Sequence, residues 1–401
     1  MDNYKTFSKN EYLRHNQALH NEMQRTGVDM LLLSTPENIF YSTGYRSWYT
    51  SSLFRPVYVL IPKSGDPAII LRILEKTTVQ LTSWTPLIYC WGSSNRNLGK
   101  LDGKNPVELL HKIICDLQPD TKTIGIEAGD GMQHFWSLNT LHEMIQSLPS
   151  IKFIDGTLAI QRARMIKTSW EIDRISYACK ITEEAILETG KSIIAGVSTE
   201  KDVASGIAKR MTENGADKIS YLTVTSGADR YCTFNSYASD RTLRKGDYIL
   251  VDISSHVDGY ASDLTRMFYI GEVPKNERAM AHVASDCVIT AKEAMKPGVS
   301  VSEINKICEG VVLQSEYAKF LLHSSGHSIG LNVVEHPFIS DDSQEILQQG
   351  MVFAVENGVY PYDLEKGCES IYLSFRMEDI VLVTEDGAQW LSGPGLPVIE
   401  L

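Results

Sequence analysis

The stretch KGDYILVDISSHVDGYASDLTRMFYI, residues 245–270, contains the pattern that decides the fold of the chain. Apolar runs on both sides flank a turn signal at Val257-Asp258-Gly259, as in a β-hairpin. Asp252 and Asp263 lie on either side of this turn, so we expect them to stand opposite each other on one face. Buried like charges so close together repel, and the pattern therefore favours a cation between them over a solvated hairpin rim.

A weak internal repeat extends this pattern over the second half of the chain. The Gly-Val-Ser unit at 196–198 returns at 298–300, and each copy lies between two stretches with helical periodicity. Each copy then reaches a glycine, an apolar strand that ends in a carboxylate, and a further strand with an acid. Duplicated units of this kind usually pack about a pseudo-two-fold axis. We therefore expect four carboxylates to converge from two halves: Asp252, Asp263, Glu356 and Glu378.

The first part of the chain has the alternating pattern of an α/β domain. We predict helices over 11–26 and 106–117, and strands over 30–33, 57–61, 68–71 and 123–127, with a turn at 35–38. A domain boundary is expected near 156–164, which divides the chain into 1–158 and 159–401. A long helix should begin after Thr168, because Glu171 completes a capping box there.

One histidine fits the same chemistry as the four acids. His327 lies in Gly326-His327-Ser328-Ile329-Gly330-Leu331, after a segment at 320–323 that we expect to be β-like. Two aspartates, two glutamates and an imidazole form a hard, oxygen-rich set that suits two divalent ions with one bridging carboxylate. Such paired ions can share an activated hydroxide and polarise a carbonyl. Mn, Zn, Co and Fe all suit this donor set, so the pattern does not choose among them.

The region from about residue 160 onward resembles the pita-bread family, which includes creatinase, aminopeptidase P, prolidase and methionine aminopeptidase. The resemblance implies a pita-bread catalytic domain with pseudo-two-fold symmetry, behind a smaller α/β domain of the creatinase type, in an α/β (α+β) chain. It also implies five metal ligands: Asp252, Asp263, His327, Glu356 and Glu378. We expect Glu378 to bridge the two ions and Glu356 to act as the proton shuttle beside them. The matching segments are 245–252, 258–266, 325–331, 350–356 and 376–379.

The first domain resembles the small domain of the creatinase, aminopeptidase P and prolidase branch. The matching residues are Phe7–Tyr12 and Asn38–Tyr45. In longer members of the family this domain packs in a homodimer and reaches the partner's site, so the resemblance implies a homodimer here. Arg55, in Phe54-Arg55-Pro56, is similar to a creatinase arginine that binds a substrate carboxylate; a surface salt bridge is the alternative.

The chain departs from the proline-specific peptidases at two histidine positions that contact the scissile amide. Those positions hold Val334 and Asn235, and neither side chain does acid–base work near neutral pH. His336 shares a face with Val334 if the segment is extended, so it either replaces the missing histidine or is a loop residue before a proline. His323 either braces the substrate site or satisfies a hydrogen bond in the core.

These departures leave more than one function open. The retained ligands favour a dinuclear metallohydrolase that cleaves an amide-type C–N bond in an Xaa-Pro peptide or a small amino-acid derivative. The lost histidines favour a small-metabolite enzyme on the same scaffold, similar to ectoine hydrolase or to the metal-dependent dimethylsulfoniopropionate lyase. A catalytically silent binding protein is a third reading, and the intact ligand set counts against it.

The amino-acid composition of the chain narrows the range of molecules that it could bind. Lys and Arg number 38 against 50 Asp and Glu, a formal net charge of −12, which argues against nucleic acid and anionic membranes. The apolar runs are too short to span a bilayer. Seven cysteines without a C-x-x-C pair suit free thiols in a reducing compartment. We expect a cytoplasmic protein with a small-molecule or short-peptide substrate.

Overall fold

The computed structural model describes residues 6–92, 101–132, 135–227, 235–361 and 374–401. The chain divides into two compact units, Met1–Arg164 and Met165–Leu401. The division lies at the end of helix α6 (Thr157–Met165), somewhat later than the boundary expected after residue 158. No helix within the described ranges is long and apolar enough to cross a membrane.

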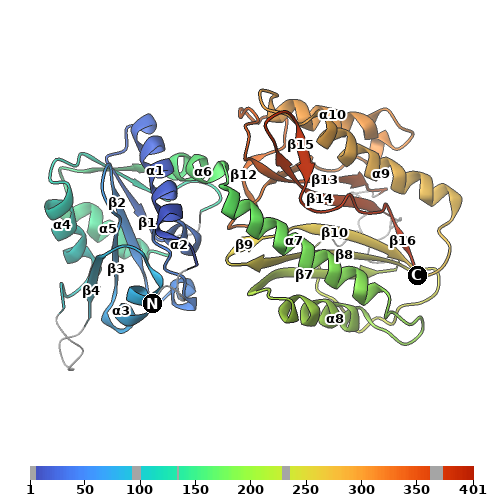
Figure 1. Ribbon diagram of the computed structural model, residues 1–401, viewed down its shortest axis with the longest axis horizontal. Helices are drawn as coiled ribbons and strands as arrows, with labels where there is room; N and C mark the ends of the chain where they lie inside the picture. Colours follow the sequence, from blue (N-terminus) through green and yellow to red (C-terminus); the bar gives the residue numbers. More distant parts are fainter. Residues whose placement is uncertain (1–5, 93–100, 133–134, 228–234, 362–373) are drawn as a thin grey trace. The chain divides into compact units, whose positions relative to one another are not determined.

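The first unit is built on a six-stranded mixed sheet (Figure 1). Its strands are β1 (Met30–Leu33), β2 (Tyr58–Pro62), β3 (Ala68–Arg72), β4 (Leu87–Trp91), β5 (Thr123–Ile126) and β6 (Lys152–Asp155), and its other helices are α1 (Lys9–Thr26), α2 (Pro36–Thr43), α3 (Lys76–Thr82), α4 (Pro106–Leu117) and α5 (Leu138–Ser147). The strand order is β4-β3-β2-β1-β5-β6, with β1 antiparallel to β2 and parallel to β5. The predicted helices and strands are therefore confirmed. The predicted turn at 35–38 is wrong, because α2 begins there with Pro36 in its first turn, where a missing N–H costs nothing.

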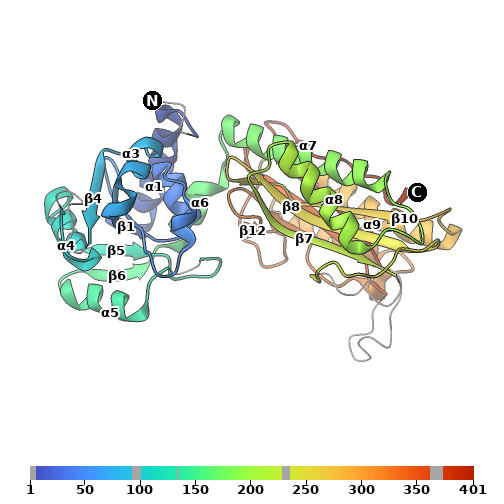
Figure 2. The same ribbon diagram turned by 90° about the horizontal axis from the view of Figure 1, so that it is seen from below.

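The second unit is built on a ten-stranded sheet (Figures 1 and 2). Its strands are β7 (Lys218–Ser226), β8 (Tyr248–Val257), β9 (Tyr260–Ala261), β10 (Leu264–Tyr269), β11 (Gly326–Ser328), β12 (Glu335–Phe338), β13 (Val352–Val359), β14 (Phe375–Val383), β15 (Ala388–Trp390) and β16 (Ile399–Glu400). Its helices are α7 (Ser169–Gly190), α8 (Glu200–Glu213), α9 (Lys275–Ala294) and α10 (Val301–Leu313). The main path of the sheet is β12-β11-β13-β14-β10-β8-β7. Buried side chains of α9 and α10 pack on β13 and β14, and those of α7 pack on β8.

The internal repeat corresponds to two similar halves that meet between β14 and β10. In both halves the Gly-Val-Ser turn connects two helices, and its glycine has a positive φ, 78° at Gly196 and 91° at Gly298. The amide of Gly196 donates to the carbonyl of Leu243 over 2.7 Å, and that of Gly298 donates to Leu347 over 2.9 Å. The two copies thus tie their turns to the chain ahead of β8 and β13 in the same way.

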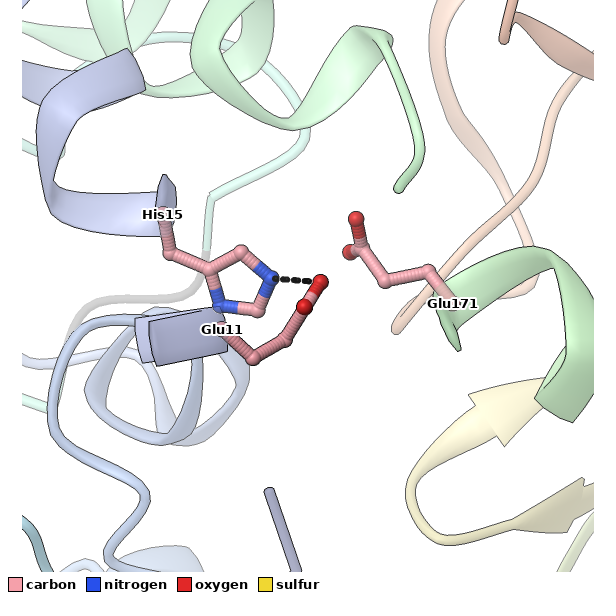
Figure 3. A group of neighbouring side chains, drawn as sticks. All are labelled: Glu11, His15 and Glu171. Carbon is pink, nitrogen blue, oxygen red and sulfur yellow. Dashed lines mark ion pairs between the residues drawn. The ribbon is translucent and has the colours of Figure 1, made fainter. Parts of the chain in front are cut away.

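Helix α7 begins as the capping box predicts. The Thr168 side chain accepts from the Glu171 amide, and the Glu171 carboxylate accepts from the Thr168 amide over 2.8 Å. Figure 3 draws Glu171 together with Glu11 and His15 of α1, which lie one helical turn apart and form an ion pair of 3.9 Å. Both helices therefore have a glutamate within their first turn, where the helix dipole favours a negative charge.

The hairpin in residues 245–270 forms, but with a different register from the one expected. Its turn contains only Asp258 and Gly259, with φ of 51° and 89°, as in a type I′ turn. The register then pairs Asp252 with Thr265. The expectation that Asp252 stands directly opposite Asp263 is therefore wrong, and Asp263 lies diagonal to it, immediately before β10.

Two further expectations concern the segment at 320–323 of the second unit and the cysteines of both units. The segment at 320–323 is not β-like; a 3₁₀ turn spans Ala318–Phe320 instead. Five cysteines are free thiols, namely Cys90, Cys115, Cys179, Cys287 and Cys308. The other two, Cys232 and Cys368, lie outside the described residues.

Candidate metal centre

Three carboxylates and a threonine form a row across the middle of the ten-stranded sheet. Glu356 on β13 pairs with Glu378 on β14, Glu378 pairs with Thr265 on β10, and Thr265 pairs with Asp252 on β8. Residues paired in this way share one face of a sheet. The row therefore crosses the line where the two halves meet, as the repeat predicts.

Asp263 and His327 complete the cluster from the same side of the row. His327 Nε2 lies 3.6 Å from Asp263 Oδ2 and 3.6 Å from Glu356 Oε1. One donor atom each from Asp263, His327 and Glu378 lie within 4.8 Å of one another. The structure thus brings together all five residues for which the sequence predicts metal binding: Asp252, Asp263, His327, Glu356 and Glu378.

The central carboxylate, Glu378, is fully buried and only half satisfied. Its Oε2 accepts a hydrogen bond of 2.7 Å from Thr265 Oγ1, while its Oε1 has no hydrogen-bond partner. A buried carboxylate oxygen without a partner carries the full cost of lost hydration. A bound cation would satisfy this oxygen.

The acids of the cluster cannot all stay ionised on their own. Burial raises the pKa of Asp263, and the charge of Asp252 raises it further. Burial likewise raises the pKa of Glu378, with Asp263 and Glu356 adding to the effect. Burial also raises the pKa of Asp252, although the Arg376 guanidinium partly offsets it. Like charges at this spacing need a cation to remain ionised at neutral pH.

Glu356 behaves differently from the other three acids. Burial opposes its ionisation, but the Arg376 guanidinium and then the imidazoles of His327 and His323 outweigh burial, so its pKa is lowered. Glu356 is therefore the acid of the cluster that is held ionised by the protein itself.

Two residues of the cluster were missed by the reasoning from sequence. The Tyr221 hydroxyl donates to Asp252 Oδ1 over 2.9 Å and also contacts Asp263. Arg376 Nη1 lies 3.0 Å from Asp252 Oδ2, and its Nη2 contacts Glu356 and lies 3.6 Å from Glu378 Oε2. Arg376 could have been found, because it stands two residues before Glu378 and so shares its face. Tyr221 carries no such signal, because a bulge between Ile219 and Tyr221 sets its register.

The donor set fits divalent metal ions. Three buried carboxylates and the half-buried Glu356 gather around one imidazole, and one of their oxygens lacks a hydrogen-bond partner. Arg376 is the sole arginine or lysine among the described residues that line the cleft. Carboxylates with an imidazole are the ligands that Mn, Fe, Co and Zn accept in proteins. The individual ligand assignments stay predictions, which this geometry supports.

A cleft of about 570 Å³ opens onto the cluster. Asn235, His323 and Val334, three of the four residues predicted to bind substrate, line it together with four of the five predicted ligands. The His323 ring is held at both nitrogens, by Ser324 O and by the Tyr360 hydroxyl, each at 2.7 Å. Burial lowers the pKa of His323. Their roles in binding substrate remain predictions.

The structure does not bring His336 to the cleft. Its Nε2 lies 3.6 Å from Glu345 Oε1, and it is absent from the lining. His336 lies on β12, which starts at Glu335, and Val334 lies in the bend before this strand. A role of His336 in place of the missing histidine stays a prediction.

Arg55 lies on the surface of the first unit. Its guanidinium stands over the rings of Trp48 and Tyr49, at 5.7 and 5.2 Å from their centres. Stacking of this kind holds an arginine head in place while leaving its donors free for a ligand. Its predicted role in binding a substrate carboxylate is not tested by this arrangement.

Comparison with known families assigns both units. Residues 173–385 match the model of metallopeptidase family M24, and residues 16–166 match the creatinase/prolidase N-terminal domain. An Xaa-Pro dipeptidase of Pyrococcus furiosus is 28% identical over 92% of this chain and 95% of its own length.

Solved structures share the fold over nearly the whole chain. A dipeptidase of Pyrococcus horikoshii has a TM-score of 0.80 at 26% identity, covering 97% of this chain and 100% of the other. The dipeptidase PepE of Mycobacterium ulcerans has a TM-score of 0.81 at 24% identity, covering 98% and 99%. The chain therefore belongs to metallopeptidase family M24, with a pita-bread domain preceded by a creatinase-type α/β domain.

Proposed function

We propose that this M24 protein is a dinuclear metal-dependent hydrolase that cleaves an amide-type C–N bond in an Xaa-Pro peptide or a small amino-acid derivative. The observation that carries the proposal is the gathering of four carboxylates and one imidazole at a single cleft, which Asp252, Asp263, His327 and Glu356 line. The relative from Pyrococcus furiosus, named as an Xaa-Pro dipeptidase, supports the same substrate class.

The proposal assigns the five donors to two ions. Asp252 and Asp263 would hold one ion, His327 and Glu356 would hold the other, and Glu378 would be the ligand shared by both. Two such ions supply Lewis acidity toward a substrate carbonyl and toward water. Mn, Zn, Co and Fe all fit the donor set.

The residues around the ligands orient them and manage the proton. The Tyr221 hydroxyl donates to Asp252 and contacts Asp263, and so orients the two carboxylates, while Thr265 fixes one oxygen of Glu378. Glu356 is held ionised by Arg376, so its carboxylate accepts a proton from the attacking water and passes it to the leaving nitrogen.

A second candidate is a metal-dependent lyase that removes a proton next to a carboxylate. The placement of Asn235 and Val334 in the cleft favours it, because neither side chain can protonate a leaving amine. An elimination does not need the two amide-contacting histidines of the peptidases.

The remaining proposals concern the oligomeric state of the enzyme and its location in the cell. A homodimer, in which Arg55 binds a substrate carboxylate at the partner's site, is supported by the creatinase-type first domain. A cytoplasmic location is supported by the free thiols at the five cysteines that the structure describes.

Turnover of an Xaa-Pro dipeptide in ¹⁸O-labelled water tests the function. The metal-loaded protein is expected to release proline and to place one labelled oxygen in the new carboxylate of the other product. Chelation should abolish this turnover and added Mn²⁺ should restore it. An alkene product would favour the lyase, and full turnover after chelation would contradict both metal-dependent candidates.

A further inference from the structure

Three apolar side chains at the mouth of the metal-centre cleft are exposed to an unusual degree. Leu322 is 39% exposed, Val334 is 49% exposed and Phe338 is 49% exposed, and all three line the cleft. Single exposed apolar residues are common on protein surfaces, but a group around one concave site marks a place where a ligand buries apolar area.

The loop that carries Val334 is built rigidly. The Glu335 carboxylate closes the loop on itself, because its Oε1 accepts from the Asn332 amide over 3.0 Å. Its Oε2 lies 3.4 Å from the ammonium of Lys167, whose side chain is almost fully buried. Lys167 also donates to Ser328 Oγ over 3.1 Å, next to His327. A buried ion pair with further hydrogen bonds thus fixes the loop beside the cluster.

A backbone hydrogen bond ties the same loop to the hairpin that bears Asp263. The Ala261 amide donates to the Gly330 carbonyl over 2.8 Å. Within the loop, Gly330 packs closely against Glu335, since a Cβ on Gly330 would stand 2.7 Å from the carboxylate. The apolar side chain of Val334 is therefore held at a fixed place relative to the predicted ligands.

From this geometry we propose that Leu322, Val334 and Phe338 form an apolar wall that binds an aliphatic group of the substrate beside the metal centre. The wall selects substrates whose group next to the scissile bond is an uncharged aliphatic side chain or ring. Val334 acts by burial alone, because it has no hydrogen-bonding group. The inference rests on the proposed metal centre, and it makes Val334 a specificity-determining residue.

The test uses alkyl hydroxamates, which bind divalent ions through their head group and direct the chain into the cleft. Dissociation constants of acetohydroxamate, butyrohydroxamate and hexanohydroxamate are measured by titration calorimetry on the Mn²⁺-loaded protein, without turnover. Each buried CH₂ is worth about 0.8 kcal/mol, or about fourfold in binding. Hexanohydroxamate should therefore bind at least tenfold more tightly than butyrohydroxamate.

Val334→Thr keeps the shape of the wall and adds a hydroxyl. It should cut the preference for hexanohydroxamate over butyrohydroxamate to about threefold while leaving acetohydroxamate binding unchanged. Val197→Thr is the matched control, since Val197 is 68% exposed on a turn outside the cleft, and it should keep the full gain. An affinity that does not change with chain length in the unmodified protein would overturn the apolar wall. Failure of acetohydroxamate to bind would contradict the metal centre itself, and with it the inference.

Discussion

At the scale of single residues, Arg376 keeps the metal-free cluster together. Its guanidinium contacts Asp252, Glu356 and Glu378, and those contacts compensate for part of the mutual repulsion of the acids. Breaking a buried ion pair by removing one partner usually costs several kcal/mol, since the other charge stays buried and unpaired.

Arg376→Met should therefore lower the free energy of unfolding of the chelated protein by about 3–5 kcal/mol. Urea unfolding in the presence of chelator measures this change. Arg278→Met is the control, because its pair with Glu400 is largely exposed and should contribute less than about 1 kcal/mol. Equal losses for the two variants would show that Arg376 does not hold the cluster.

The pKa shifts of the acids predict how the stability of the metal-free protein depends on pH. Burial raises the pKa of Asp263 and of Glu378, so the folded state keeps protons that the unfolded chain releases near pH 4. The free energy of unfolding then falls as pH rises above about 4. The pKa of Glu356 is lowered, so its ionised carboxylate stabilises the folded protein. This contribution reaches its full value above about pH 5 and stays constant at higher pH, so it does not reverse the fall.

We therefore expect the thermal midpoint of the chelated protein to fall between pH 5 and pH 8, as followed by circular dichroism. Added divalent ions should remove the fall, because metal binding requires deprotonated carboxylates and strengthens as pH rises. A chelated midpoint that rises over this range would mean that the acids titrate normally and that the cluster is not buried as described.

At the scale of elements, the loop at 330–335 should depend on Lys167 for its order. Lys167→Met removes the ammonium from Glu335 and Ser328 and leaves the Glu335 carboxylate buried without it. Hydrogen–deuterium exchange of the amides at 329–336 should then become at least tenfold faster, while α7 keeps its protection. Lys180→Met, which alters an exposed pair on α7, is the control. Unchanged exchange in the Lys167 variant would contradict the braced loop.

Elements also show where reasoning from sequence succeeds and where it stops. Helix starts with local signals, such as Thr168 with Glu171, are predictable because a few adjacent residues determine them. The register of the β8–β10 hairpin was missed because the turn holds two residues, and a shift there moves every pairing along the strands. The sequence left two roles open for His336, because the direction of its side chain depends on where β12 begins.

At the scale of the whole molecule, the two units should respond differently to metal. All five predicted ligands lie within Met165–Leu401, and none lies in Met1–Arg164. Anything that binds only the folded form of a domain raises the stability of that domain. Differential scanning calorimetry with and without chelator should therefore shift the transition of the second unit by several degrees and leave that of the first unchanged. An equal shift of both units would contradict this division.

The acidic character of the chain has two components at this scale. Most of its 50 carboxylates contribute to a charged surface that disfavours nucleic acid. Within the cluster, Asp252, Asp263 and Glu378 are buried and Glu356 is half-buried, and only nearby cations make such a grouping of acids stable. Sequence alone could identify these four acids, because the repeat places them at matching positions, but it could not supply Tyr221, which reaches them from another strand.

The central claim is that this cluster binds two divalent ions that hydrolysis requires. It is tested most directly by titrating the chelated protein with Mn²⁺, while bound metal per chain and hydrolysis of an Xaa-Pro dipeptide are followed in the same samples. The account predicts two bound ions per chain, with turnover appearing as the sites fill, and at most one bound ion without turnover for Glu378→Gln. Turnover that is complete before any metal binds, or two bound ions in the Glu378 variant, would contradict it.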